Sequence, residues 1–239
     1  MVFAILGHAF RMIYGDISAV LRLSLPLCLL IGMELILQNS DIPAEHRTSG
    51  LSVFISLINL GASFWVAVAW HRYILLEEYP DGALPRFNGP EIWRYCLWSF
   101  GLSIAFALPL AMIGGVMFGL ADLDVLGPGA MLILIPLGFV LFWALARVSP
   151  ILPAVAVGKQ LTPVEAWSAT RPIALGLVWI LLLLSLGGTL LSGLSLALYS
   201  AVPFLGIIAA GVLQWLLTML PLSVATTIYG VYVEGRSLD

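Results

Sequence analysis

Three polar side chains lie inside long apolar stretches of the sequence, where an unpaired polar group is costly. Glu34, Asn59 and Gln214 remain as strong polar groups once the arginines near the ends of these stretches are set aside. Such groups mark either hydrogen bonds between helices or a polar binding site. Glu34 can also reach water from a helix end or pair with Arg47, so both interpretations stay open.

The residue types that carry catalysis do not occur at catalytic spacing. His8, His46 and His71 lie on three different segments, and no two of them are spaced as metal ligands. Cys28 and Cys96 are too few for a disulfide framework. GxSxG, HExxH, P-loop and dinucleotide-binding motifs are absent from the sequence, as is a convincing nucleophile–base pair. We therefore expect a non-enzyme with no metal and no cofactor.

The composition indicates a membrane protein. Of the 239 residues, 61% are hydrophobic and only 10% are charged, and the mean hydropathy is +1.07. A soluble domain has about 25% charged residues. The net charge of −3 provides no basic field for nucleic acid. About 20 apolar residues cross a bilayer as a helix, and six runs are long enough, at residues 18–38, 51–76, 92–120, 129–149, 172–199 and 204–231.

The predicted fold is therefore a single all-α domain over residues 1–239, a bundle of six transmembrane helices. Residues 2–15 are too short to span, and their polar and apolar faces predict an amphipathic helix in the interface. Glu34, Asn59 and Gln214 then form a candidate intramembrane polar site in the outer half of the bundle. Four spans contain a proline, which indicates either packing kinks or the broken helices of a transporter: Pro26, Pro109, Pro136 and Pro221.

Basic residues are distributed unevenly among the connections between spans. Of the 10 lysines and arginines, only Arg47 falls on the side expected to be outside, so the positive-inside rule places both termini in the cytoplasm. The basic side chains of the cytoplasmic connections either bind anionic lipid headgroups or only set this topology: Arg72, Arg86, Arg94, Arg147, Lys159 and Arg171. His71 is expected to face water or headgroups. Four tryptophans near the same ends are expected at the interface: Trp70, Trp93, Trp98 and Trp167.

The connection between the fourth and fifth spans has the most specific local pattern. Pro150 and Pro153 should end or bend the fourth span near Ser149. The short apolar piece that follows is either interfacial or tucked against the bundle. Residues 162–165 read Thr-Pro-Val-Glu, a capping box with proline at the first helical position, and predict a short cytoplasmic helix over residues 163–170.

This connection also resembles a known family. The pattern comprises Arg147-x-Ser149, Leu152-Pro153-Ala154, Gly158, Ala166-Trp167-Ser168 and Thr170-Arg171. It is similar to the linker of the uncharacterised bacterial YciC-like inner-membrane proteins, and of the membrane domain that accompanies some glycerophosphodiester phosphodiesterases. The clear similarity covers residues 143–185. It implies a six-helix bundle with an interfacial amino-terminal helix in the bacterial inner membrane, and no catalytic residue carries over.

Two functions are compatible with these features. The first is a non-enzymatic integral inner-membrane protein, a scaffold, accessory subunit or envelope-homeostasis factor with anionic-lipid contact. The second is a small permease or lipid translocator that uses the kinked helices and the polar site of Glu34, Asn59 and Gln214. The expected partners are membrane lipids, and either other membrane proteins or a second copy of the chain, but no nucleic acid.

Overall fold

The computed structural model describes residues 1–39, 49–122 and 129–238, and every regular element in these ranges is helical. Six helices are long and apolar enough to cross a membrane, which confirms the predicted spans. These helices are α2 (Ile17–Gln38), α3 (Ser49–Leu76), α4 (Gly89–Asp122), α5 (Gly129–Val148), α8 (Ala174–Ala201) and α9 (Pro203–Tyr232). The shorter helices are α1 (Val2–Tyr14), α6 (Ile151–Ala156), α7 (Pro163–Ala169) and the 3₁₀ turn η2 (Arg171–Ile173).

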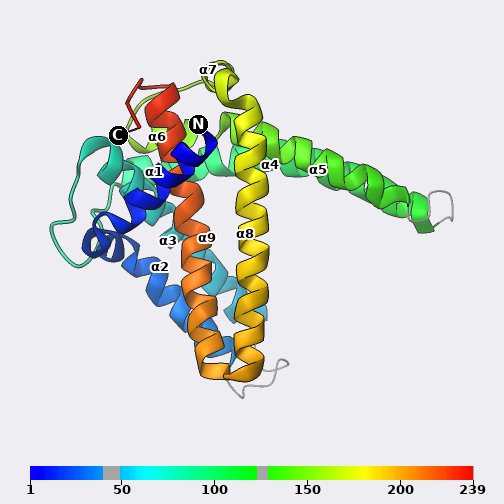
Figure 1. Cartoon of the computed structure of the whole chain (residues 1–239), viewed down its shortest axis with the longest axis horizontal. Coiled ribbons are helices and arrows are strands. Elements are labelled where there is room, and N and C mark those ends of the chain that lie inside the picture. Colours follow the sequence, from blue (N-terminus) through cyan, green and yellow to red (C-terminus); the bar gives the residue numbers. More distant parts are fainter. Residues whose placement is uncertain (40–48, 123–128, 239) are drawn as a thin grey trace.

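The main bundle consists of α2, α3, α8 and α9 (Figure 1). Helices α8 and α9 form the most extensive helix pair and are separated only by Val202, so the predicted tight hairpin is confirmed. None of the four prolines interrupts its helix, so each acts at most as a kink. The outer face of α8 has a row of exposed leucines, among them Leu186 and Leu190, as expected for a surface that meets lipid.

Helix α1 lies obliquely across α9 and also contacts α8 and α2 (Figure 1). Its apolar residues Ile5, Ala9 and Ile13 are fully buried in the main core, whereas Phe3 and Tyr14 are exposed. This division of one helix into a buried and an exposed side agrees with the predicted amphipathic helix.

The α4–α5 hairpin diverges from the main bundle at a wide angle (Figure 1). Near its base, α4 packs against α6 and α3, and α5 packs against α8 and α7. A second core joins these elements and includes Tyr95, Leu102, Val148 and Ile151. The two helices of the hairpin are therefore anchored at one end and lean away from α8 and α9 at the other.

The connection between α5 and α8 folds as its sequence predicts. Helix α5 ends at Val148, directly before the residues that the two prolines were expected to disturb. Helix α6 is tucked into the protein, since Ile151, Ala154 and Ala156 are buried. The capping box is present: the Glu165 backbone N–H donates to Thr162, and the Glu165 carboxylate accepts from the Thr162 backbone N–H. Hydrogen bonds that the Thr162 backbone N–H and hydroxyl donate to the Glu165 carboxylate hold its pKa below the ordinary value.

Candidate functional site

One end of the bundle is closed by elements that are far apart in the sequence. We call this the closed end, and it comprises α1, residues 77–94, α6, α7, η2 and the tail at residues 233–238. The Arg236 side chain donates to the Leu75 carbonyl at 2.7 Å, and Arg11 donates to the Leu238 carbonyl at 3.5 Å. Both termini therefore lie at the same end of the bundle, opposite the α8–α9 turn (Figure 1).

Arg72 links two helices within the closed end. Its Nε donates to Glu78 at 2.8 Å and its Nη1 donates to the Ala156 carbonyl at 3.1 Å, while a second bond to Glu78 completes a fork. The hydrogen bonds from Arg72 hold the pKa of Glu78 below its ordinary value. Arg72 therefore links α3 to α6, because its donors are bound to protein acceptors. The prediction that Arg72 contacts lipid headgroups does not hold in this structure.

Arg147 is buried, with only 5% of its surface exposed. Its Nε donates to the Thr170 hydroxyl at 3.0 Å and its Nη2 donates to the Trp167 carbonyl. The guanidinium lies 4.1 Å from the centre of the Trp167 ring and 5.5 Å from that of Trp143. The prediction that Arg147 faces headgroups is therefore corrected, because this side chain links α5 to α7. The buried guanidinium is stabilised by hydrogen bonds to a carbonyl and a hydroxyl and by contact with two aromatic ring faces.

The other predicted headgroup contacts are exposed. The guanidinium groups of Arg86, Arg94 and Arg171 make no hydrogen bond or ion pair in the described part of the chain, although the Arg86 backbone carbonyl accepts a hydrogen bond from the Trp65 indole at 3.1 Å. Each has an exposed aromatic residue nearby in sequence: Phe87 at 69%, Trp93 at 63% and Trp167 at 40%. Cations and amphipathic rings together are typical of the headgroup level of a membrane. Trp98 is also exposed, but Trp70 is fully buried, so its predicted place at the interface is wrong.

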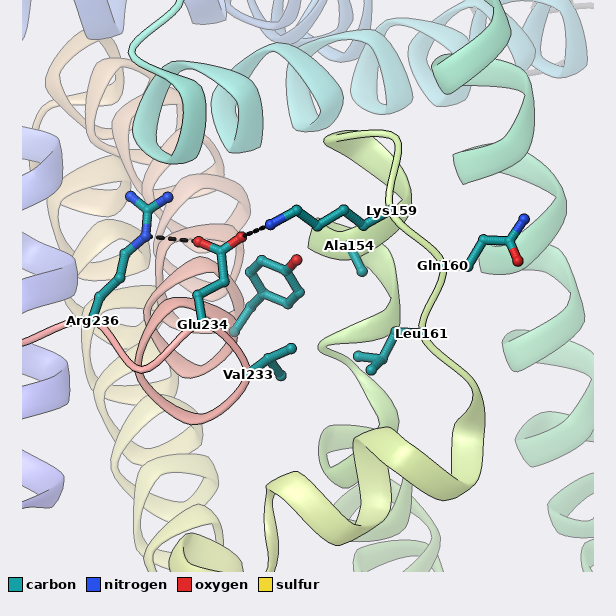
Figure 2. A pocket seen from close by; sticks show the side chains of 8 residues that line it. Ala154, Lys159, Gln160, Leu161, Val233, Glu234 and Arg236 are labelled. Carbon is teal, nitrogen blue, oxygen red and sulfur yellow. Dashed lines mark hydrogen bonds and ion pairs between the residues drawn. The ribbon is translucent and has the colours of Figure 1, made fainter.

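Lys159 is the fourth predicted headgroup contact that is exposed, and it borders a pocket beneath the tail (Figure 2). The pocket has a volume of about 470 Å³ and lies between the α6–α7 connection and the end of α9. Glu234 lies between Lys159 and Arg236 and pairs with both at 2.7 Å. Burial raises the pKa of Glu234, but these two partners outweigh it and bring the pKa below its ordinary value. Glu234 thus engages both cations, although its single negative charge offsets only one of the two positive charges.

The structure brings together two of the three residues of the predicted intramembrane polar site. The Asn59 amide on α3 donates to the Glu34 carboxylate on α2 at 3.3 Å. Gln214 instead lines a separate cavity of about 600 Å³ between α2, α8 and α9, together with Asn39 and Tyr199. Neither Glu34 nor Asn59 lines that cavity. Arg47, the alternative partner of Glu34, is outside the described residues.

A buried polar cluster around His71 was missed by the sequence analysis. His71 is fully buried, and its ring nitrogens contact the Thr226 hydroxyl at 2.8 Å and the Tyr95 hydroxyl at 3.4 Å. The expectation that His71 faces water or headgroups is therefore wrong. Successive helix positions are about 100° apart, so His71 and Arg72 point in different directions and need not share one environment. This geometry, together with the polar Thr226 on α9, was the available signal.

An apolar cleft lies where the α4–α5 hairpin leaves the main bundle, and we call it the hairpin cleft. Its volume is about 400 Å³, and its walls come from α3, α4, α5, α6, α8 and α9. Most of the lining is leucine, isoleucine, phenylalanine and alanine, but the walls also contain hydroxyl groups: Ser63, Tyr95, Ser99, Ser103, Ser149 and Thr218. The Ser99 oxygen is buried and has no hydrogen-bond partner in the described structure.

No group of three or more His, Cys, Asp or Glu side chains is positioned to hold a metal ion in residues 1–39, 49–122 and 129–238. Comparison of the chain with protein-family models, with curated proteins and with solved structures finds no match in any of the three. The family resemblance of residues 143–185 therefore stays a prediction, and function has to be inferred from the geometry.

Proposed function

We propose that the protein is a non-enzymatic integral membrane protein whose closed end binds anionic lipid headgroups, as a scaffold, accessory subunit or envelope-homeostasis factor. One observation supports this proposal above all: Arg86, Arg94 and Arg171 are exposed, their guanidinium groups make no hydrogen bond or ion pair with the described protein, and they lie near exposed aromatic residues. A guanidinium without a protein acceptor is available to a phosphate, which it binds through two parallel hydrogen bonds.

The expected strength follows from the number of available cations. A basic residue near an anionic membrane surface contributes about 1 kcal/mol. Three such arginines then favour anionic over zwitterionic lipid by about 3 kcal/mol, on the order of a hundredfold. Arg72 and Lys159 contribute less because each already pairs with a glutamate, Glu78 and Glu234 respectively.

The lipid retained by purified protein tests this proposal. The variant R86Q/R94Q is reconstituted in nanodiscs of phosphatidylcholine and phosphatidylglycerol, and the phosphatidylglycerol that stays bound is counted by native mass spectrometry. K159Q/R236Q removes the same charge from residues paired with Glu234 and is the matched control. We expect clear loss of phosphatidylglycerol from R86Q/R94Q alone. Equal loss from both variants, or wild-type retention in both, would contradict the proposal.

We also propose that the chain is a YciC-like protein of the bacterial inner membrane with both termini in the cytoplasm. The resemblance of residues 143–185 and the clustering of basic connections support this assignment. In a background in which Cys28 and Cys96 are replaced by alanine, a membrane-impermeant maleimide applied to intact cells should label Val202→Cys and spare Gln160→Cys. The reverse pattern would refute the orientation.

A small permease or lipid translocator is the second candidate, and the cavity of about 600 Å³ around Gln214 favours it. The Glu34–Asn59 hydrogen bond adds a polar contact between α2 and α3. Scrambling of a fluorescent phospholipid in proteoliposomes should then be abolished by Glu34→Gln and by Gln214→Leu, with the fold intact by circular dichroism. Unchanged scrambling in both variants would remove this candidate.

A further inference from the structure

We infer that the hairpin cleft holds one acyl chain of a membrane phospholipid, whose phosphate lies toward Arg94 at the start of α4. The cleft is bounded on one side by the α4–α5 hairpin and on the other by α8 and α9. All four of these helices are long and apolar enough to span a membrane. The medium around the cleft is therefore lipid, and an acyl chain is the occupant that this medium supplies.

The chemistry of the walls favours a hydrocarbon chain over water. Side chains such as Leu181, Leu184 and Leu222 form most of the lining. Water in such a cavity needs two to four polar partners to be held, and apolar cavities of this kind stay dry or take an apolar guest. A volume of about 400 Å³ also falls within the range of ligand pockets, roughly 300–1,000 Å³.

Two of the hydroxyl groups in the cleft, those of Tyr95 and Ser99, lie near the start of α4 and suit the glycerol ester region of a phospholipid. Ser99 lies in the third turn of α4, and its buried hydroxyl has no partner in the described structure, so it can donate to an ester carbonyl. The Tyr95 hydroxyl lies one turn earlier on the same helix and is held by His71. Arg94, the residue before Tyr95, is exposed and has no bond to the described protein.

The order of groups along α4 therefore matches the order of groups along a phospholipid. From the start of the helix, the sequence runs from the cation Arg94 through the hydroxyls of Tyr95 and Ser99 to Leu102, and Ser103 is the one further hydroxyl that α4 adds to the lining. A phospholipid presents phosphate, ester carbonyls and hydrocarbon in the same order. This inference rests on the proposed function only for the phosphate, because the apolar walls and Ser99 do not depend on the exposed arginines of the closed end.

Filling the cleft tests the inference. The full-length protein is placed in nanodiscs that contain phosphatidylglycerol with a diazirine in its acyl chain, and cross-linked peptides are mapped by mass spectrometry. Ser103→Phe introduces a ring into the cleft, and Ala105→Phe introduces the same ring at an exposed position of α4 outside the lining. We expect cross-links on cleft residues in the wild type and in Ala105→Phe, and about a tenfold loss of them in Ser103→Phe.

Two outcomes would overturn the inference. One is equal labelling of the cleft residue Leu181 and of the outward-facing Leu186 in the wild type, which indicates annular lipid only. The other is unchanged cleft labelling in Ser103→Phe. Ser99→Ala removes the hydroxyl proposed to donate to the ester carbonyl and carries little risk to folding. We expect it to weaken cleft labelling severalfold. R86Q/R171Q leaves Arg94 in place, so it should lower phosphatidylglycerol retention but leave cleft labelling intact. The headgroup proposal and the acyl-chain inference can therefore fail independently of each other.

Discussion

Arg147 provides the sharpest test of how the closed end is held together. Arg147→Lys keeps the positive charge but removes the planar fork that reaches both the Thr170 hydroxyl and the Trp167 carbonyl. A hydrogen bond from a charged donor contributes about 1.5–3 kcal/mol, and the cation–π contact at 4.1 Å adds about 0.5–2 kcal/mol. Lysine can keep one hydrogen bond and part of the ring contact, so we expect a loss of about 2–4 kcal/mol in the free energy of unfolding.

The assay is unfolding of purified protein in detergent, followed by circular dichroism. For a chain of this length, the expected loss corresponds to a fall in Tm of roughly 5–10 °C. Arg94→Lys is the matched control, because Arg94 is exposed and has no bond to the described protein; it should change the unfolding free energy by less than about 0.5 kcal/mol. Equal destabilisation of the two variants would refute the conclusion that the Arg147 side chain links α5 to α7.

Three further predictions concern the same end of the molecule. His71→Ala should lower the unfolding free energy by about 2–4 kcal/mol in the same detergent assay, because it leaves a cavity and unpairs the buried Tyr95 hydroxyl. The pKa values of Glu78 and Glu234 are held below the ordinary 4.5, so both carboxylates stabilise the fold at neutral pH and lose this effect as the pH falls through their folded pKa values. The Tm measured from pH 7 to pH 3 should therefore decline less steeply in Glu78→Gln/Glu234→Gln than in the wild type. A parallel decline of the two Tm curves would contradict the role assigned to these ion pairs. Thr162→Ala should cost about 1 kcal/mol by loss of the helix cap, measurable by the same unfolding assay.

The elements of this protein follow from local sequence, and that part was predictable. Apolar runs set the six long helices, and the capping box set α7, because each depends on residues within a turn or a span of one another. The short apolar piece after Ser149 left two alternatives, and the structure supports the buried one. Its placement needed contacts with α3 and α4 that no local pattern contains.

The fates of individual polar residues were harder to predict, because they depend on partners far along the chain. Arg94 and Arg147 are the same residue type near the same end of the bundle, yet one is exposed and the other buried. The difference lies in Trp167 and Thr170, which reach Arg147 only after α7 has folded back. Likewise Arg72 meets the Ala156 carbonyl across 84 positions of sequence.

The contact between α1 and α9 has a consequence for synthesis. Helix α1 is synthesised before α9 and packs mainly on it, and the Tyr232 hydroxyl reaches the Met1 sulfur at 3.2 Å. Until translation has delivered α9, α1 lacks its most extensive contact and has only α2 and α8 to pack against. Synthesis of α9 therefore completes the docking of α1, and a ribosome stalled before α9 would leave α1 without that contact.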